Sequence, residues 1–414
     1  MSDLTTKFRQ KDSNDRTLAI NKWQNVGTRI FGGRMGTYSQ SATYTHQITL
    51  TVEQHFDAVR IIHANTFKNG SFVTTTVGAS VISSLTDANN SGGTWYSVID
   101  DSNRGFCWAM SPADSRIEYN LSEWIPIKSI PRTDGGTLPL LVVRSVIKGN
   151  TLGIPCVGDG SDVFSNWATN PSGRIFISRR QQGDFVSSPT GFSSTTNLNQ
   201  SAIVGVQYAS RGKVITVMGN GDSITDSRGT YLGQGFIYSA CQELTTPEIA
   251  VEYANCGWSG QSPQEFYNRG FDILQSEIKP DVLVFPSNSP NIGEIMNETI
   301  INTSAGLRNA LIAECTKKGV IPVMWTMLPV NNSQKNFGSS DALRVADNLQ
   351  LTTLAANSNY VFIADTATAL SGTTIDNQVQ MLIGSTDDGI HPNDTGNDIL
   401  KGVIKETIKK ATGL

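Results

Sequence analysis

The second half of this 414-residue chain alternates between apolar strand-like segments and helical patterns, and this alternation constrains the fold more than any other feature. Segments typical of buried strands lie at 214–218, 249–254, 281–285, 320–327 and 360–364. Helical patterns lie at 232–244, 263–278, 300–318, 340–356 and 393–411. A parallel connection needs a long crossover, so this order favours a parallel sheet. The sequence therefore predicts an α/β domain at 211–414 with a doubly wound, five-stranded parallel sheet.

Residues 1–210 follow a different pattern, in which short apolar or alternating segments recur between turn signals. Examples are THQITLTV, TLPLLVVRSVI, GRIFISRR and SAIVGVQYA. Turn-forming stretches rich in Gly, Asn and Asp lie between such segments, at 89–93, 133–136 and 158–161. Many short strands joined by such turns are typical of an all-β sandwich or jelly roll. We therefore expect two domains, an accessory β domain at 1–210 and an α/β domain at 211–414.

The charge balance does not indicate a polyanionic partner. The formal net charge is −4, only 16% of the residues are charged, and the basic residues form no stripe. A nucleic-acid or anionic-membrane surface is therefore not expected. The five cysteines, at 107, 156, 241, 256 and 315, are widely spaced and lack a CxxC pair. Buried thiols are favoured over a disulfide framework or a metal site.

The amino terminus, MSDLTTKFRQKDSNDRT, is polar and has no apolar core typical of a secretory signal. The sequence also lacks a run of roughly 18 apolar residues that could span a bilayer. We therefore expect a soluble protein that is made in the cytoplasm. This expectation leaves open a virus particle or another non-classical route to an extracellular destination.

The stretch VITVMGNGDSITDSRG at 214–229 places a serine directly after a predicted strand. Gly219 and Gly221 permit a sharp turn there, and ligands bind at the carboxyl ends of strands in α/β sheets. Ser223 could be a nucleophile or the N-cap of the next helix. Thr225 breaks the Gly-x-Ser-x-Gly pattern of α/β-hydrolases, and Ile224 breaks a dinucleotide-binding pattern.

The α/β half contains one histidine, His391, in the sequence Asp-Asp-Gly-Ile-His-Pro-Asn at 387–393. Imidazole is the side chain suited to acid–base work near neutral pH, so His391 is the internal candidate for that role. Asp388 lies three residues earlier, where its carboxylate could fold back onto the ring. The alternative is a surface turn that ends in a helix cap. His46, His55 and His63 are not at metal-ligand spacing and are expected to be ordinary residues of the β domain.

Three segments in this order resemble the conserved blocks of the SGNH (GDSL-like) hydrolase family. Gly-Asp-Ser-Ile-Thr at 221–225 resembles the first block, and Asn-Cys-Gly-Trp-Ser-Gly-Gln-Ser at 255–262 resembles the second. Asp-Gly-Ile-His at 388–391 resembles the last block, Asp-x-x-His. The resemblance covers about residues 211–414 and carries no information about the first 210. It implies an SGNH-type fold and a serine hydrolase that needs no metal or organic cofactor.

By this resemblance Ser223 is the nucleophile, His391 is the base and Asp388 orients His391. Family members stabilise the oxyanion with the N–H of the serine, an N–H of the second block and an Asn side chain of the third. The second donor maps to Gly260, where the absence of a side chain allows close approach to substrate, whereas Gly257 fits a role in the turn.

The third block departs from the Gly-x-Asn-Asp pattern of the family. The chain reads Pro-Ser-Asn-Ser-Pro-Asn-Ile at 286–292. Aligning residues 289–292 with the pattern favours Asn291 as the oxyanion donor, and Asn288 is the competitor. Trp258, in the second block, could flank the substrate or pack under the turn. Asp222 is expected to be structural, Trp325 to pack in the core, and Asp387 to be solvated.

These expectations combine into a serine esterase that forms an acyl-enzyme on Ser223. The family's substrates include acetylated sugars, lipids, aryl esters and acyl thioesters. The β-rich first half favours O-acetyl groups on a polysaccharide, with an acylated carbohydrate or another ester as the partner. The polar chain without a signal also resembles bacteriophage tail-associated esterases. One alternative is a catalytically inactive glycan-binding or structural virion protein, and another is a lipase or thioesterase for longer acyl chains. The oligomeric state and the acyl group stay open.

Overall fold

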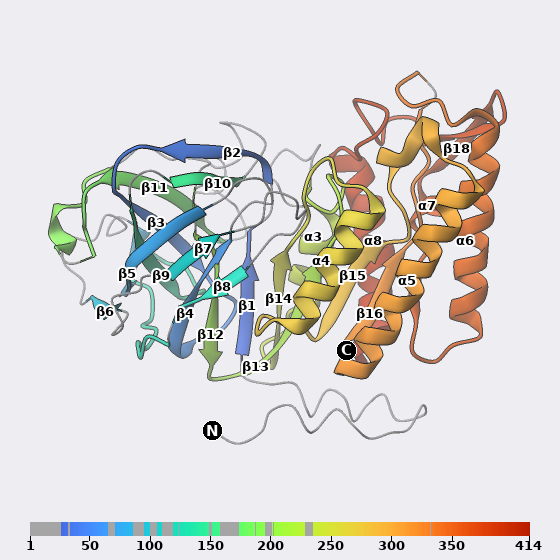
Figure 1. The fold of residues 1–414 in the computed structure, drawn as a ribbon. Helices are drawn as coiled ribbons and strands as arrows, with labels where there is room; N and C mark the ends of the chain where they lie inside the picture. Colours follow the sequence, from blue (N-terminus) through green and yellow to red (C-terminus); the bar gives the residue numbers. More distant parts are fainter. Residues whose placement is uncertain are drawn as a thin grey trace. The chain divides into compact units, whose positions relative to one another are not determined.

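The structure is a computed structural model and describes residues 26–31, 34–64, 71–85, 95–99, 106–109, 119–122, 124–148, 151–157, 174–186, 188–194, 201, 203–227, 235–331 and 333–414. The chain divides into two compact units (Figure 1). The β-rich unit comprises Asn25–Val214 and Glu248–Glu252. The α/β unit contains Ile215–Pro247 and Tyr253–Leu414. The accessory and catalytic roles expected for the two halves of the chain stay predictions.

The α/β unit is built on five strands. They are β13 (Lys213–Gly219), β14 (Ile249–Asn255), β15 (Val282–Pro286), β16 (Ile321–Trp325) and β17 (Phe362–Ala364). Their spatial order is β17-β16-β15-β13-β14. The pairs β13–β15, β15–β16 and β16–β17 are parallel. The expectation of a mixed α/β architecture with a sheet rich in parallel pairs is confirmed.

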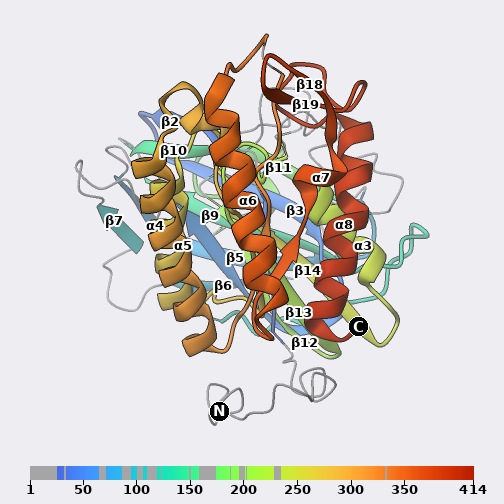
Figure 2. The same cartoon turned by 90° about the vertical axis from the view of Figure 1, so that its right-hand side faces the viewer.

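Helices separate these strands along the chain. They are α3 (Phe236–Leu244), α4 (Pro263–Gln275), α5 (Glu298–Lys318), α6 (Asp341–Ala356), the short α7 (Thr366–Ala369) and α8 (Asp394–Thr412). Helix α4 packs against α5 and α5 against α6, whereas α3 packs against α8, as Figure 2 shows. Two helical groups thus flank the sheet, as a doubly wound arrangement requires.

The strand order places a topological switch point next to the candidate nucleophile. Strand β13 comes first along the chain and lies between β14, which follows it, and β15. In an α/β sheet of this order, ligands bind beyond the carboxyl ends of the first and third strands. The first strand here ends at Gly219 and the third at Pro286. The loops that follow them carry Ser223 and the third sequence block.

The α/β unit contains a β-hairpin that was not anticipated from the sequence. Strands β18 (Ser371–Ile375) and β19 (Gln378–Met381) form an antiparallel hairpin after α7. Its two turn residues, Asp376 and Asn377, both have positive φ, at 49° and 63°. These dihedrals match the type I′ turn that two-residue hairpin loops prefer.

The described part of the β-rich unit contains two antiparallel sheets. One has the order β1-β12-β4-β8, formed by Val26–Ile30, Ile203–Ser210, Phe56–Ala64 and Tyr119–Leu121. The other has the order β11-β3-β9-β5-β10-β2, formed by Phe176–Gln182, Tyr44–Thr51, Leu140–Ile147, Ser71–Ile82, Thr151–Val157 and Arg34–Gln40. Strands β6 (Tyr96–Ile99) and β7 (Phe106–Ala109) pair with β5. A sandwich or jelly-roll topology for residues 1–210 stays a prediction.

The histidines of the β-rich unit lie within its strands or beside them. His46 and His63 are fully buried, and burial lowers the pKa of each to about 3. Both rings are therefore neutral near pH 7. His55 Nδ1 forms a hydrogen bond with Ser129 Oγ at 2.9 Å.

The described regions contain no disulfide and no membrane-spanning helix. Cys241, Cys256 and Cys315 are buried and form no disulfide with a described residue, while the side chains of Cys107 and Cys156 lie outside the described part. Among the residues placed by the structure, no helix combines the length and the apolar character needed to cross a bilayer.

Candidate active site

Ser223 lies in a buried turn that follows β13. Ser223 itself is 3% exposed. Neither Gly219 nor Gly221 has a positive φ, so the turn needs these glycines for space rather than for a left-handed backbone. A Cβ on Gly221 would lie 2.1 Å from Thr225 Oγ1, and one on Gly219 would lie 2.4 Å from the hydroxyl oxygen of Tyr253. The close packing of this turn therefore explains the two glycines.

The N-cap alternative for Ser223 does not hold in the structure. Helix α3 begins at Phe236, and its N-cap is Gly235. Residues 221–227 instead form successive turns. The side chain of Ser223 is engaged elsewhere, because its Oγ lies 2.8 Å from Nε2 of His391.

His391 and Asp388 complete a chain of three hydrogen-bonded side chains that begins at Ser223. His391 Nδ1 lies 2.6 Å from Asp388 Oδ2. The other carboxylate oxygen of Asp388 accepts the backbone N–H groups of His391 at 2.7 Å and Ile390 at 2.9 Å. The structure thus brings together the three residues that the sequence selected as the triad, and it joins them in the order Ser223, His391, Asp388.

The electrostatics of Asp388 determine which ring nitrogen of His391 carries the proton. Partial burial opposes ionisation of Asp388, but the backbone and ring N–H groups of His391 and the N–H of Ile390 outweigh it and lower the pKa of the carboxyl group. An ionised carboxylate only accepts hydrogen bonds, so His391 Nδ1 must donate. Nε2 is then the free acceptor that faces the hydroxyl of Ser223. This tautomer is the one that a general base needs.

Several hydrogen-bond donors near the nucleophile have no partner among the described residues, and three of them lie in the segments that the sequence selected for the oxyanion site. They are the N–H of Ser223, the N–H of Gly260 and the side-chain Nδ2 of Asn288. Gly260 has a φ of +82°, a conformation that favours glycine, and no described atom lies within 4 Å of where its Cβ would be. The three donors follow β13, β14 and β15, whose carboxyl ends frame the switch point. Free donors in such a place can stabilise a developing negative charge.

The two asparagines of the third block differ in how their amides are used. Asn288 is fully buried, and its Oδ1 accepts the N–H of Ser289 at 3.1 Å, which leaves its Nδ2 without a partner in the described part of the chain. Asn291 is exposed, and its Nδ2 donates to the carbonyl of Gln261 at 2.9 Å. The geometry therefore favours Asn288 as the donor over the sequence-based preference for Asn291.

Asp222 connects the nucleophile turn to the third block. Its Oδ2 accepts a short hydrogen bond from the Ser289 hydroxyl, and its Oδ1 accepts the N–H of Ile224 at 2.9 Å. Burial raises the pKa of Asp222, although the Ser289 hydroxyl, the neighbouring N–H groups and the charge of His391 oppose the shift. Ser289 Oγ also accepts the N–H of Asn291 at 3.1 Å. Asp222 thus contacts the third block through Ser289, which the sequence did not single out.

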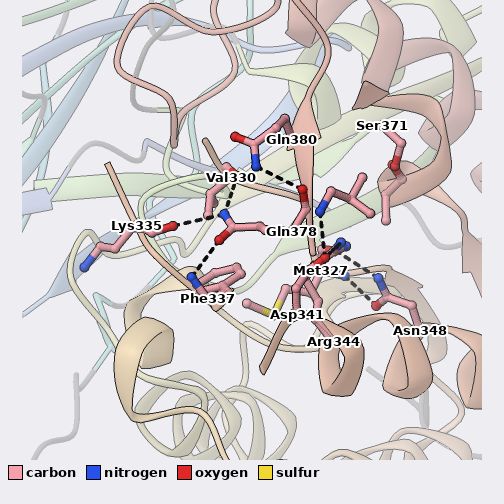
Figure 3. Close-up of polar contacts among 12 residues, drawn as sticks. Met327, Val330, Lys335, Phe337, Asp341, Arg344, Asn348, Ser371, Gln378 and Gln380 are labelled. Atoms are coloured by element: carbon pink, nitrogen blue, oxygen red, sulfur yellow. Dashed lines mark hydrogen bonds and ion pairs between the residues drawn. The ribbon is translucent and has the colours of Figure 1, made fainter. Parts of the chain in front are cut away.

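A polar network supports the turn that carries Asp388. The N–H of Asn331, in the loop after β16, donates to the carbonyl of Gly389 at 2.8 Å. This loop is in turn held by the fully buried amide of Gln378, as Figure 3 shows. Gln378 Nε2 donates to the carbonyls of Val330 and Lys335 at 2.8 and 3.0 Å, and its Oε1 accepts the N–H of Phe337 at 2.8 Å. The β18–β19 hairpin therefore braces the acid turn through this loop.

A second part of the same network fixes the beginning of that loop. Met327 exchanges both of its backbone hydrogen bonds with the side chain of Asn348, each at 3.0 Å. Arg344 donates to the carbonyl of Met327 at 3.2 Å and forms an ion pair with Asp341 (Figure 3). Asp341 also accepts the N–H of Val379 at 2.9 Å. Both ends of the loop are thus tied to α6 and the hairpin.

Other residues weighed from the sequence fall outside the reacting centre. Trp258 is 4% exposed, and its backbone N–H donates to the carbonyl of Gly221 at 3.0 Å. The structure therefore favours packing under the turn over contact with substrate. Trp325 is fully buried against Phe236, with ring centroids 5.8 Å apart. Asp387 accepts the side-chain N–H of Asn393 at 2.8 Å.

Solved structures that are similar to this chain include GDSL-type lipolytic enzymes, and each match covers about half of the chain. The GDSL-like lipase from Bacteroides thetaiotaomicron shares 19% identity at a TM-score of 0.37, over 47% of this chain and 88% of that one. An acetylxylan esterase from Geobacillus stearothermophilus shares 17% identity at a TM-score of 0.37, over 48% and 94%. An esterase from Pseudoalteromonas sp. shares 14% identity at a TM-score of 0.37, over 48% and 99%. No protein-family model matches the sequence, and no curated protein matches it.

Proposed function

We propose that the chain is a serine esterase that removes ester-linked acyl groups, with O-acetyl groups on a polysaccharide as the substrate. The observation that carries the proposal is the chain of contacts from Ser223 Oγ to His391 Nε2 at 2.8 Å and from His391 Nδ1 to Asp388 at 2.6 Å. A hydroxyl, an imidazole and an ionised carboxylate in this order form the arrangement that activates a serine for acyl transfer.

In the first half of the reaction, Ser223 Oγ attacks the ester carbonyl while its proton moves to His391 Nε2. The carbonyl oxygen becomes an oxyanion, and we assign its stabilisation to the free N–H groups of Ser223 and Gly260 and to Asn288 Nδ2. Collapse of this intermediate breaks the ester C–O bond, and His391 returns the proton to the departing sugar oxygen. The acetyl group is then bonded to Ser223 Oγ.

In the second half of the reaction, water replaces the alcohol. His391 takes a proton from water, the resulting hydroxide attacks the acyl carbon, and the same donors hold the second oxyanion. Collapse breaks the bond to Ser223 Oγ, which recovers a proton from His391, and the carboxylic acid leaves. Asp388 stays ionised and stabilises the imidazolium that forms in both halves.

The chemistry of the surrounding loops supports a small, polar substrate. The residues that follow the Gly260 and Asn288 donors include Gln261, Ser289 and Asn291, all with polar side chains. Binding a long acyl chain draws about 0.8 kcal/mol from each buried CH₂, which requires an apolar wall. The polar loops therefore favour acetyl over a long chain. We assign polysaccharide positioning to the β-rich unit and extend the proposal to a virion-borne enzyme that acts on capsule or O-antigen.

The proposal is tested by acetate release from p-nitrophenyl acetate and from a panel of acetylated polysaccharides. Ser223→Ala should abolish release, whereas Ser358→Ala, in the half-buried segment between α6 and β17, should leave it unchanged. Equal rates for the Ser223→Ala variant and the wild-type protein would refute the proposal and leave a glycan-binding or structural protein. A rate that rises steeply with acyl-chain length would instead identify a lipase or thioesterase.

A further inference from the structure

Arg269 is buried behind the turn that carries the nucleophile. It lies on α4, and only 1% of its surface is exposed. Its Nε donates to Oδ1 of Asn220 at 2.8 Å, and its Nη2 donates to the carbonyl of Gly221 at 2.6 Å. Its Nη1 donates to the side-chain oxygen of Gln261 through a close contact. All three nitrogens of the guanidinium group thus bind these acceptors.

The acceptors of Arg269 belong to two different loops, and each loop carries one free donor. Asn220 and Gly221 lie just before Ser223, in the loop after β13. Gln261 directly follows Gly260, in the loop after β14. One rigid, planar group therefore connects the segment that presents the Ser223 N–H to the segment that presents the Gly260 N–H.

The helix that carries Arg269 is itself held against the nucleophile turn. Asn220 Nδ2 donates to the carbonyl of Phe266 at 2.7 Å. A Cβ on Gly270 would lie 2.8 Å from the Leu311 side chain and 3.1 Å from Asn220 Nδ2. At the start of α4, Ser262 and Glu265 form a capping box. Arg269 is thus anchored on the scaffold as well as on both loops.

The other two connections among the three donor-bearing loops do not involve Arg269. The Ser289 hydroxyl joins the third block to Asp222, and Asn291 Nδ2 joins it to the carbonyl of Gln261. Other hydrogen bonds also join the first loop to the second. They include a backbone bond from Trp258 to Gly221 and a bond from Ser259 Oγ to Asp226 at 3.1 Å. These two bonds do not involve Gly260 or Gln261.

We propose that Arg269 is a positioning residue that sets the separation of the Ser223 and Gly260 N–H groups, and thereby the geometry of the oxyanion site. The proposal rests on the proposed esterase function. In the esterase mechanism proposed above, Arg269 contacts no reacting atom. Its effect depends on the fork of three nitrogens, which a lysine with one nitrogen cannot reproduce. Arg269→Lys keeps the buried charge but loses the geometry.

The test compares an ester with its thiono analogue, in which sulfur replaces the carbonyl oxygen. Sulfur is a larger and weaker acceptor, so correctly placed N–H donors favour p-nitrophenyl acetate over p-nitrophenyl thionoacetate. The ratio of the two kcat/KM values does not depend on how much enzyme is folded. We expect Arg269→Lys to lower kcat for the ester about 10- to 100-fold, to change KM little, and to lower the ratio about tenfold.

Arg344→Lys is the matched control, because Arg344 is also a buried helical arginine and lies in the network of Figure 3. It should leave the ratio as in the wild-type protein, even if it lowers the folded fraction. Gln261→Leu leaves Arg269 in place but removes its acceptor in the loop after β14, and it should lower the ratio as well. The proposal can therefore be tested even if Arg269→Lys does not fold. The double variant should be no worse than the more impaired single variant, since both break one connection.

A ratio that stays at the wild-type value in both Arg269→Lys and Gln261→Leu would overturn the positioning role and leave Arg269 as a purely structural arginine. This outcome differs from a failure of the proposed function. If the wild-type protein hydrolyses the ester no faster than Ser223→Ala, the esterase assignment itself fails. The Ser223→Ala comparison is therefore made first.

Discussion

Both carboxylate oxygens of Asp388 bind the same residue, His391. One accepts the ring Nδ1 at 2.6 Å and the other accepts the backbone N–H at 2.7 Å. The carboxylate therefore holds both the ring and the backbone of His391, which lies three residues later in the same turn. Its pKa is held below the usual value by these N–H groups against the effect of burial, so the acceptor form persists at neutral pH.

The first prediction concerns Asp388→Asn. The new amide can still accept the backbone N–H groups, but its NH₂ group would face Nδ1 and favour the wrong tautomer of His391. We expect kcat for p-nitrophenyl acetate to fall by about 10³-fold, less than the 10⁴ known for a fully buried triad aspartate, because half of the Asp388 side chain is exposed. Asp387→Asn, one residue away, is the control and should retain activity. Similar losses in both variants would contradict the orienting role.

The second prediction separates Asn288 from Asn291. Asn288 has a buried, unpartnered Nδ2, so Asn288→Ala should remove an oxyanion donor and lower kcat by about 10²- to 10³-fold with little change in KM. The Asn291 amide already donates to Gln261, so Asn291→Ala should cost less than about tenfold. Steady-state kinetics of both variants decide the point. A larger loss in Asn291→Ala would restore the assignment first favoured from the sequence.

The third prediction concerns the glycine within the acid turn. Gly389 has a φ of +76°, and a Cβ there would lie 2.6 Å from the side chain of Gln334. Gly389→Ala should therefore displace the turn that holds Asp388 and lower kcat about tenfold or more. Gly384→Ala is a close control, because Gly384 has a φ of +82° but open space around it. It should carry the same backbone strain without the loss of activity. An equal loss of kcat in Gly389→Ala and Gly384→Ala would show that backbone strain, rather than the contact with Gln334, causes the loss.

The sequence predicted the strands and long helices of the α/β unit well, because buried strands and amphipathic helices leave periodic apolar patterns. The β18–β19 hairpin was missed because its strand Ser371–Ile375 is largely exposed and carries little apolar signal. The Asp376-Asn377 pair between two short β-prone segments was the signal that could have revealed it.

The contact of Ser223, Asp388 and His391 could be anticipated from the sequence because the three residues lie in recognisable local motifs. The choice between Asn288 and Asn291 could not, since it depends on the path of the loop after β15. That path is set by the contact of Ser289 with Asp222, which lies 67 residues away in the sequence. Arg269 was missed for the same reason, because its partners come from two loops whose proximity only the fold establishes.

The fourth prediction concerns the pH dependence of stability and uses Asp281, which lies just before β15. Burial raises its pKa to about 7, against the Thr216 N–H that it accepts at 2.8 Å and the charge of Lys279. The unfolded pKa is about 4, so the folded protein binds an additional proton between about pH 4 and 7. The contribution of this group to stability is therefore fully present below about pH 4 and is lost as the pH rises through 7.

Asp281→Asn keeps an acceptor for Thr216 and cannot ionise. Its free energy of unfolding should therefore exceed that of the wild-type protein increasingly from pH 4 to 8, by up to about 1 kcal/mol per pH unit. Urea unfolding at a series of pH values measures this difference, with Asp398→Asn as the control for removing an exposed charge. Parallel pH profiles for Asp281→Asn and the wild-type protein would show that the pKa of Asp281 is the same in the folded and unfolded states. The Thr216 N–H and the charge of Lys279 would then fully offset the effect of burial on this pKa.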